Sequence, residues 1–114
     1  MGHLEKVTSD TFEDRVLGSE LPVLVEFSTS RCPACLAARP LLESLAAEFE
    51  GRAKIVEANV EEDQDLGTAF QIRAVPTLVF FKNGAFVDGV MGAPPAAILR
   101  RKLEQMSESC SPRG

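Results

Sequence analysis

The stretch LPVLVEFSTSRCPACLAARPLLESLAAEF, residues 21–49, decides the fold because a strand signal and a helix signal meet there at a pair of cysteines. Leu21 to Phe27 is apolar except for Glu26, which is typical of a buried central strand. Leu36 to Phe49 repeats apolar residues at helical spacing. The pair in Cys32-Pro33-Ala34-Cys35 is therefore predicted where a central strand passes into a helix.

This placement favours thiol chemistry. With Cys32 as the N-cap, Pro33 occupies the first helical position, where its missing N–H leaves no hydrogen bond unmade. Ala34 and Cys35 are then expected to direct their backbone N–H groups at the Cys32 sulfur. Unpaired amides and the positive end of the helix dipole stabilise a thiolate, which is the nucleophilic form of cysteine.

The composition indicates one ordinary globular domain of 114 residues, with 45% hydrophobic and 25% charged residues. A net charge of -5 argues against a nucleic-acid surface, and no apolar run reaches the roughly 20 residues of a membrane helix. Two of the three cysteines form the C-x-x-C motif, which fits a redox or metal role in a reducing compartment. The first six residues lack the apolar core of a signal peptide, so we expect cytoplasmic residence. A monomer is expected.

The order of periodic segments predicts an α/β fold with a mixed sheet and helices on both of its faces. A helix between Asp10 and Gly18 is expected, with Asp10 and Glu13 as its N-terminal signal. Asn83-Gly84 predicts a two-residue hairpin. The predicted strands are 4–7, 21–27, 53–60, 76–81 and 85–91, and the later helices are 36–49, 61–70 and 94–106. Residues 1–106 would form the domain and 107–114 a flexible tail.

A C-x-x-C motif also opens many zinc sites, so a metal role is the first alternative. Structural zinc needs four ligands, and only His3 and Cys110 remain, both in terminal segments. We therefore expect no bound metal. A non-catalytic interaction module is the second alternative, and the presence of both cysteines disfavours it.

Ordered markers along nearly the whole chain show that it resembles the thioredoxin family. The strand, Cys32 and Cys35 follow one another as they do in that family. Further markers stand at the matching places: Phe12, Pro40, Val75-Pro76-Thr77, Phe81-Lys82-Asn83-Gly84 and Gly92. The resemblance implies a thioredoxin-like fold, with a central mixed sheet flanked by helices on both faces.

The resemblance also implies roles for individual residues. Cys32 would be the attacking thiol, Cys35 the buried resolving thiol, and Pro76 a cis-proline that faces the pair. No cofactor would be bound, because the Cys32–Cys35 disulfide is itself the redox centre. Electrons would come from a nicotinamide-dependent flavoprotein reductase.

Several positions depart from the family pattern. Pro33-Ala34 replaces the usual Gly-Pro between the cysteines, and Arg31 and Ser28 each replace a Trp. Glu26 stands for a buried Asp, and Glu57 stands for the Lys that commonly pairs with it. The departures predict an atypical reduction potential and altered partner choice.

Further residues are candidates for the site. Arg31 places a cation beside Cys32, where it can favour the thiolate, although an exposed loop arginine often has no role. Val75 would pair its backbone with an extended substrate segment, and Gly92 would also belong to the substrate-binding surface. Ala74 and Ala93 would give a small apolar rim, although small apolar residues usually serve only packing. Glu26 would exchange a proton with Cys35 if its side chain is buried, whereas at an edge it would only aid solubility.

The predicted function is a protein-disulfide reductase that works by dithiol exchange at Cys32 and Cys35. Its substrate-binding surface would comprise Arg31, Pro33, Ala34, Val75, Gly92 and Ala93. Its potential is expected above the roughly -270 mV of thioredoxin and below the roughly -120 mV of the periplasmic oxidase. A disulfide oxidase or isomerase with a dedicated partner remains an alternative.

Overall fold

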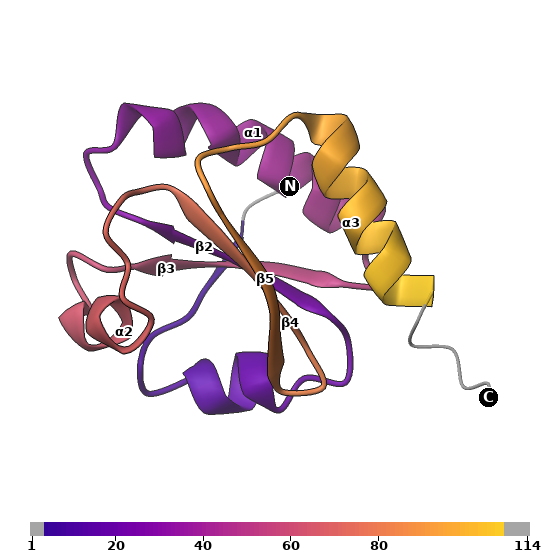
Figure 1. Cartoon of the computed structure of the whole chain (residues 1–114), viewed down its shortest axis with the longest axis horizontal. Coiled ribbons are helices and arrows are strands. Elements are labelled where there is room, and N and C mark those ends of the chain that lie inside the picture. Colours follow the sequence, from indigo (N-terminus) through magenta and orange to yellow (C-terminus); the bar gives the residue numbers. More distant parts are fainter. Residues whose placement is uncertain (1–3, 109–114) are drawn as a thin grey trace.

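Strand β2 (Val23–Ser28) is the middle strand of a five-stranded sheet, and all of its residues are buried (Figure 1). The structure, a computed structural model, describes residues 4–108. The strand order is β1-β3-β2-β4-β5, and the other strands are β1 (Glu5–Lys6), β3 (Lys54–Asn59), β4 (Thr77–Lys82) and β5 (Ala85–Met91). The predicted mixed sheet is confirmed, because β1 and β2 run parallel to β3 whereas β4 is antiparallel to β2 and β5.

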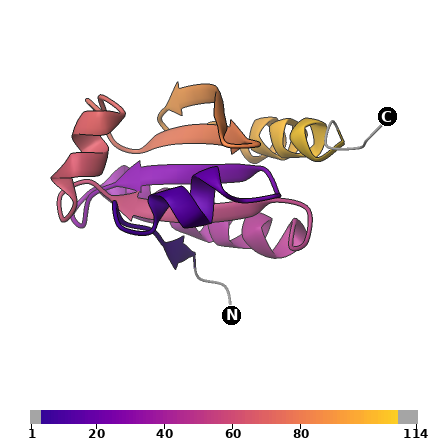
Figure 2. The same cartoon turned by 90° about the horizontal axis from the view of Figure 1, so that it is seen from below.

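Helices cover both faces of this sheet, as predicted (Figures 1 and 2). Side chains of α1 (Pro33–Glu48) and α3 (Ala96–Glu108) pack with Leu24 of β2. Side chains of η1 (Glu13–Leu17) and α2 (Gln64–Ala69) pack with Val25 and Phe27 on the other face. Since successive strand residues point to opposite faces, Glu26 shares the face of Leu24 and points towards α1.

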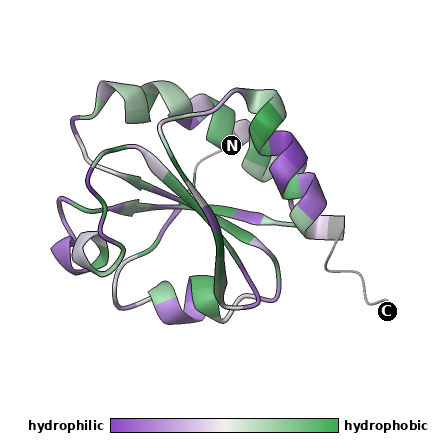
Figure 3. Cartoon of the chain, in the orientation of Figure 1, coloured by the Kyte–Doolittle hydropathy of each residue, from purple (hydrophilic) through white to green (hydrophobic). Residues whose placement is uncertain are grey.

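The hydrophobic residues gather in the central strands and on the inner sides of the helices (Figure 3). The layer between the sheet and helices α1 and α3 contains five fully buried side chains: Leu42, Leu45 and Phe49 from α1 and its C-cap, and Leu99 and Leu103 from α3. Burying each such side chain stabilises the fold by about 1.5–3 kcal/mol. This packing fixes α1, and with it the two cysteines at its N-terminus, against the sheet.

The first helix begins differently from the prediction. Phe12 occupies the N-cap of η1 and no side chain caps it, so the capping role expected for Asp10 was wrong. Two threonines take the local hydrogen bonds instead: the Thr8 N–H donates to Thr11 Oγ1 at 2.9 Å, and the Asp10 N–H donates to Thr8 Oγ1 at 3.2 Å. The predicted end at Gly18 is confirmed, because its N–H donates to Glu13 O at 2.7 Å.

The hairpin predicted at Asn83-Gly84 is confirmed. Lys82 pairs with Ala85 across it, and Asn83 and Gly84 have φ values of 55° and 78°, as a type I′ turn requires. The second strand of this hairpin, β5, is an edge strand and exposes Phe86 and Met91. Figure 2 shows β4 and β5 at one side of the sheet and β1 at the other.

Helix α3 passes the boundary expected between domain and tail. It continues to Glu108, and the Ser107 hydroxyl donates to Leu103 O at 2.9 Å. Ser107 and Glu108, which the sequence analysis assigned to the tail, thus belong to α3, and the division into domain and tail stays a prediction. Residues 109–114, which include Cys110, lie outside the described part of the chain, as does His3.

Candidate active site

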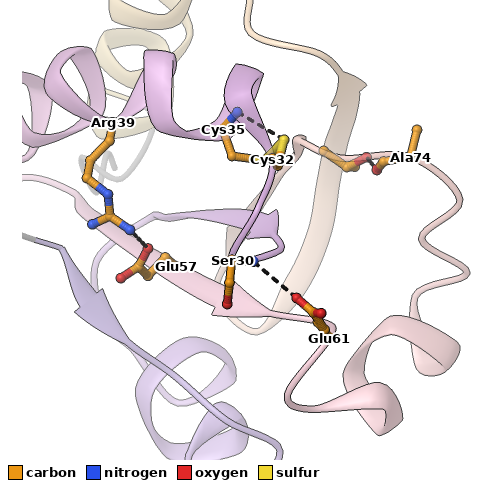
Figure 4. The surroundings of a disulfide bond; sticks show 8 residues. Ser30, Cys32, Cys35, Arg39, Glu57, Glu61 and Ala74 are labelled. Carbon is orange, nitrogen blue, oxygen red and sulfur yellow. Dashed lines mark hydrogen bonds and ion pairs between the residues drawn. A yellow bond between two sulfur atoms is a disulfide. The ribbon is translucent and has the colours of Figure 1, made fainter.

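The site is built where β2 ends and α1 begins, as the sequence predicts. Cys32 and Cys35 form a disulfide across the first turn of α1 (Figure 4). Cys32 is the N-cap in an extended conformation, and Pro33 is the first helical residue. The Cys35 N–H donates to the Cys32 sulfur at 3.0 Å. The helix N-terminus thus directs an amide at a sulfur, which is the electrostatic arrangement that stabilises a thiolate.

The second expected donor is not found. Among the hydrogen bonds of residues 4–108, none joins the Ala34 N–H to the Cys32 sulfur, so that expectation was wrong for this disulfide form. An N-cap side chain accepts from the second or the third helical amide. The disulfide ties the Cys32 sulfur to Cys35, which is the third helical residue, and this geometry selects the third amide.

The surroundings of the two cysteines differ more than their exposure does. Cys32 is 8% exposed and Cys35 is 5% exposed, so burial alone does not distinguish the attacking from the resolving thiol. Arg31, Pro33 and Ala34 are all exposed beside Cys32. Cys35 instead lines a polar cleft. The difference in surroundings agrees with the predicted roles, which remain predictions.

A second loop, Ala74 to Thr77, lies in the surroundings of the disulfide (Figure 4). The Val75–Pro76 peptide bond is cis, as expected, and the role of Pro76 facing the pair stays a prediction. Thr77 Oγ1 donates to Ala74 O at 2.7 Å, and the Gly92 N–H donates to Pro76 O at 2.7 Å. The structure therefore brings Pro76 and Gly92, two of the candidate site residues, into contact.

Val75, which precedes Pro76, and Ala93, which follows Gly92, are both at least partly accessible to solvent. Val75 is half-buried, and Ala93 is exposed next to Gly92. Gly92 has a φ of 90°, a conformation that side chains disfavour. Within the described chain, no hydrogen bond uses the backbone N–H or carbonyl of Val75. The backbone N–H and carbonyl of Val75 are thus available to pair with an added strand.

Glu26 is buried, with an exposed fraction of 1%, so the alternative of a solvated edge position was wrong. Its Oε2 atom has no hydrogen-bond partner. Burial, followed by the nearby Glu57 carboxylate, raises the pKa of Glu26 from 4.5 to about 7, while the Arg39 cation opposes the rise. A carboxyl group with this pKa can both accept and release a proton near neutral pH.

Glu26 and Cys35 line one cleft of about 190 Å³ between α1 and the parallel half of the sheet. Arg39 and Glu57 line it too, and Arg39 Nη2 donates to Glu57 Oε1 (Figure 4). The cleft also receives Lys6, whose ammonium group pairs with a surface carboxylate. It is therefore a polar space with a buried acid and a cysteine at its inner end.

Sequence reasoning missed Arg39. The sequence drew attention to Glu57 only because it replaces a lysine of the family pattern. The partner of Glu57 is Arg39, which lies 18 residues earlier in the chain, on a helix. One signal was available: Arg39 follows Cys35 by four residues, which places both side chains on one face of α1.

Residues 4–108 contain no cluster of three or more His, Cys, Asp or Glu side chains that could hold a metal ion. Within the same residues, no helix has the length and apolar character needed to cross a membrane.

Comparison with known proteins identifies the family. The family model described as Thioredoxin matches residues 3–105. The chain is 38% identical over 105 residues to Thioredoxin 1 of Nostoc sp., covering 92% of this chain and 98% of that protein. It is 37% identical over 105 residues to Thioredoxin of Synechocystis sp., with the same coverage of 92% and 98%.

A plant relative is similar at the same level. The chain is 37% identical over 105 residues to Thioredoxin M-type, chloroplastic, of Pisum sativum, covering 92% of this chain and 61% of that protein. With the disulfide of Cys32 and Cys35, these matches make the protein a thiol-disulfide oxidoreductase with a thioredoxin-like fold. The chain belongs to the thioredoxin family.

Proposed function

We propose that this protein reduces disulfides of protein substrates by two successive exchanges. The Cys32 thiolate attacks one sulfur of the substrate disulfide, so that a Cys32–substrate bond forms and the first substrate thiolate leaves. Cys35 then attacks the Cys32 sulfur, which forms the Cys32–Cys35 bond and releases the second substrate thiolate. The substrate gains two electrons, and the dithiol loses two.

The observation that carries this proposal is the hydrogen bond from the Cys35 N–H to the Cys32 sulfur at the start of α1. It supports Cys32 as the nucleophile, because an amide and a helix dipole directed at one sulfur favour its thiolate. Arg31 adds a cation to the adjacent exposed loop, where it can favour the same charge and attract acidic substrates.

Glu26 is proposed as the proton acceptor for Cys35. Both line the same cleft, and the raised pKa of Glu26, caused first by burial, lies near neutrality. Cys35 must lose its proton before it can attack the mixed disulfide. A carboxylate that is costly to keep charged in a buried site readily takes that proton.

Substrate binding is proposed on the exposed side of the disulfide. An extended substrate segment would pair with the backbone of Val75, whose N–H and carbonyl make no other hydrogen bond in residues 4–108. Pro76 would hold this segment against Cys32, and Gly92 and Ala93 would border it without bulky side chains. Pro33 and Ala34 would contact the substrate from the start of α1.

The potential is proposed to be more oxidising than that of ordinary thioredoxin. On reduction, the Cys32 sulfur is no longer bound to Cys35 and can accept a second amide, from Ala34. A proline at that position has no N–H to donate. A hydrogen bond to a charged group contributes about 1.5–3 kcal/mol, and about 1.4 kcal/mol corresponds to a shift of about 30 mV.

We further propose a nicotinamide-dependent flavoprotein reductase as the electron donor, and a cytoplasmic monomer as the working form. Each turnover leaves the Cys32–Cys35 disulfide, so a two-electron donor must reduce it again, and the resemblance to thioredoxins implies a reductase of this class. The pea relative is chloroplastic by name, so the compartment calls for a direct localisation experiment. If the donor did not reduce the Cys32–Cys35 disulfide, the oxidase or isomerase alternative would be favoured.

Trapping experiments with insulin as the disulfide substrate test the proposal. Cys32→Ser should abolish reduction, because the first attack is lost. Cys35→Ser should accumulate a Cys32–insulin mixed disulfide, because only the second attack is lost. Both variants are made in a Cys110→Ser background, which removes the third thiol. Equal trapping by the two variants would contradict the assigned roles, and a lack of insulin reduction by the unaltered dithiol protein would favour an interaction module.

A further inference from the structure

Three charged side chains meet in the cleft behind the disulfide. Glu26 of β2 and Glu57 of β3 occupy directly paired positions on neighbouring parallel strands. Arg39 reaches Glu57 from α1, four residues after Cys35 (Figure 4). All three line the cleft to which Cys35 also contributes. Two carboxyl groups therefore share one nearby cation.

The two carboxyl groups are in different situations. The Glu57 side chain is 14% exposed and is hydrogen-bonded to Arg39, whose side chain is 36% exposed. Glu26 is almost fully buried, and its Oε2 has no partner. The charge of Glu26 thus depends on neighbours that it does not contact through a hydrogen bond.

The other elements around Glu26 place few further charged groups near its carboxyl group. On β4 the residue paired with Glu26 is Leu78, which carries no charge. Lys6 of β1 is paired with Glu62 at 2.7 Å on the outer side of the cleft. Glu43 of α1 lies 3.9 Å from Arg39 and is the only further carboxylate that pairs with it among the described residues. Cys35 is the remaining titratable group that lines the cleft.

We propose that the Arg39–Glu57 ion pair is a positioning pair that sets the charge state of Glu26, and thereby the pH range in which Glu26 accepts a proton from Cys35. The second half of this statement rests on the proton-acceptor role proposed above. Neither Arg39 nor Glu57 needs to contact the substrate or the reacting sulfurs.

The pair has a signature that a simple structural ion pair lacks, because its two members act on Glu26 with opposite sign. Removing Arg39 takes away a cation and leaves Glu57 unneutralised, and both changes disfavour a charged Glu26. Removing Glu57 takes away an anion and leaves Arg39 free, and both changes favour a charged Glu26. Since charges within about 4–6 Å shift a pKa by about 1–3 units, a shift of about one unit in each direction is expected.

Titration of Glu26 in the disulfide form provides the test. Its carboxyl signal is followed by carbon NMR from pH 4 to pH 9 and is assigned by its absence in Glu26→Gln. Arg39→Gln should move the midpoint up by about one pH unit, and Glu57→Gln should move it down by about one. Arg39→Lys, which keeps the charge, should restore most of the original midpoint.

A matched control is available on the outer part of the same helix. Glu48 of α1 pairs with Arg100 of α3 at 2.9 Å, away from the cleft. Arg100→Gln and Glu48→Gln each break an ion pair that joins α1 to a neighbouring element. Both should leave the Glu26 midpoint within about 0.2 unit, because exposed charges beyond a Debye length of about 10 Å are screened.

The pH profile of mixed-disulfide resolution separates this proposal from the role of Glu26 itself. If the pH profiles of resolution shift with the Glu26 midpoints in Arg39→Gln and Glu57→Gln, both the control of Glu26 by the ion pair and its role as proton acceptor are supported. Midpoints that shift while the profiles stay fixed would overturn the proton-acceptor role but support the control of Glu26 by the ion pair. Midpoints that stay fixed, or that move in the same direction in both variants, would overturn the proposal.

Discussion

Replacing Glu26 by Gln measures how strongly the fold opposes the charge of this buried carboxylate. Burial and the neighbouring Glu57 raise the pKa of Glu26 from 4.5 to about 7. Between these values the folded protein keeps the proton and the unfolded chain releases it, so stability falls as the pH rises through this window. The gap corresponds to about 3 kcal/mol, which is fully lost above pH 7.

Glutamine has nearly the same shape and stays neutral at every pH. Near pH 4, where Glu26 is also neutral, the variant and the wild type should have similar stability. At pH 8.5 the variant should be more stable by about 3 kcal/mol, because it carries no buried charge. The same variant should slow the attack of Cys35 on mixed disulfides, so stability and activity change in opposite directions.

Urea unfolding of the disulfide form between pH 4 and pH 8.5 provides the measurement, because Cys32 and Cys35 do not titrate in that form. With an m-value of about 1.5 kcal/mol/M, the expected difference moves the midpoint by about 2 M at the upper pH. Glu48→Gln is the control, and its effect should stay below about 1 kcal/mol throughout, since it breaks an exposed ion pair. Parallel pH curves for Glu26→Gln and the wild type would refute the reasoning.

Two further predictions concern the first turn of α1 and the loop beside it. The double change Pro33→Gly with Ala34→Pro should lower the reduction potential, measured against glutathione, by about 30 mV or more. It should also raise the pH midpoint of Cys32 alkylation. If neither quantity changes, the potential is set by residues other than these two. Gly92→Ala should lower the free energy of unfolding by about 1–2 kcal/mol through its φ of 90° alone, since no atom lies within 4 Å of the added Cβ. Gly89→Ala is the control and should lower it less. Equal losses in urea unfolding would contradict the strain argument.

Most of the fold was predictable because its signals are local and agree with one another. The apolar run of β2, the helical spacing of α1 and the Asn83-Gly84 turn each specify one element by their own residues. The start of η1 was not predictable in this way. Asp10 and Glu13 have the spacing of a capping box, but Thr8 and Thr11 satisfy the local amides and leave Asp10 without that role.

The site was predictable as far as the chain itself brings residues together. Cys32 and Cys35 are adjacent on one helical turn, and Pro76 and Gly92 were found by resemblance. The face of Glu26 could not be decided from alternation, because both faces of β2 are buried. The Arg39–Glu57 contact joins a helix to a strand, and no local pattern specifies such a pair.

The central place of β2 also has a consequence for biosynthesis. Its two partners, β3 and β4, follow it in the chain, and β4 is complete only at Lys82. At roughly 5–20 residues per second, a ribosome needs about 3–11 seconds to pass from the end of β2 to the end of β4. Both edges of β2 are open until β3 has been made, and the edge that later pairs with β4 stays open for the whole interval. Glu26 is therefore enclosed late, and until then its carboxylate keeps a charge that helps hold an otherwise apolar strand in water.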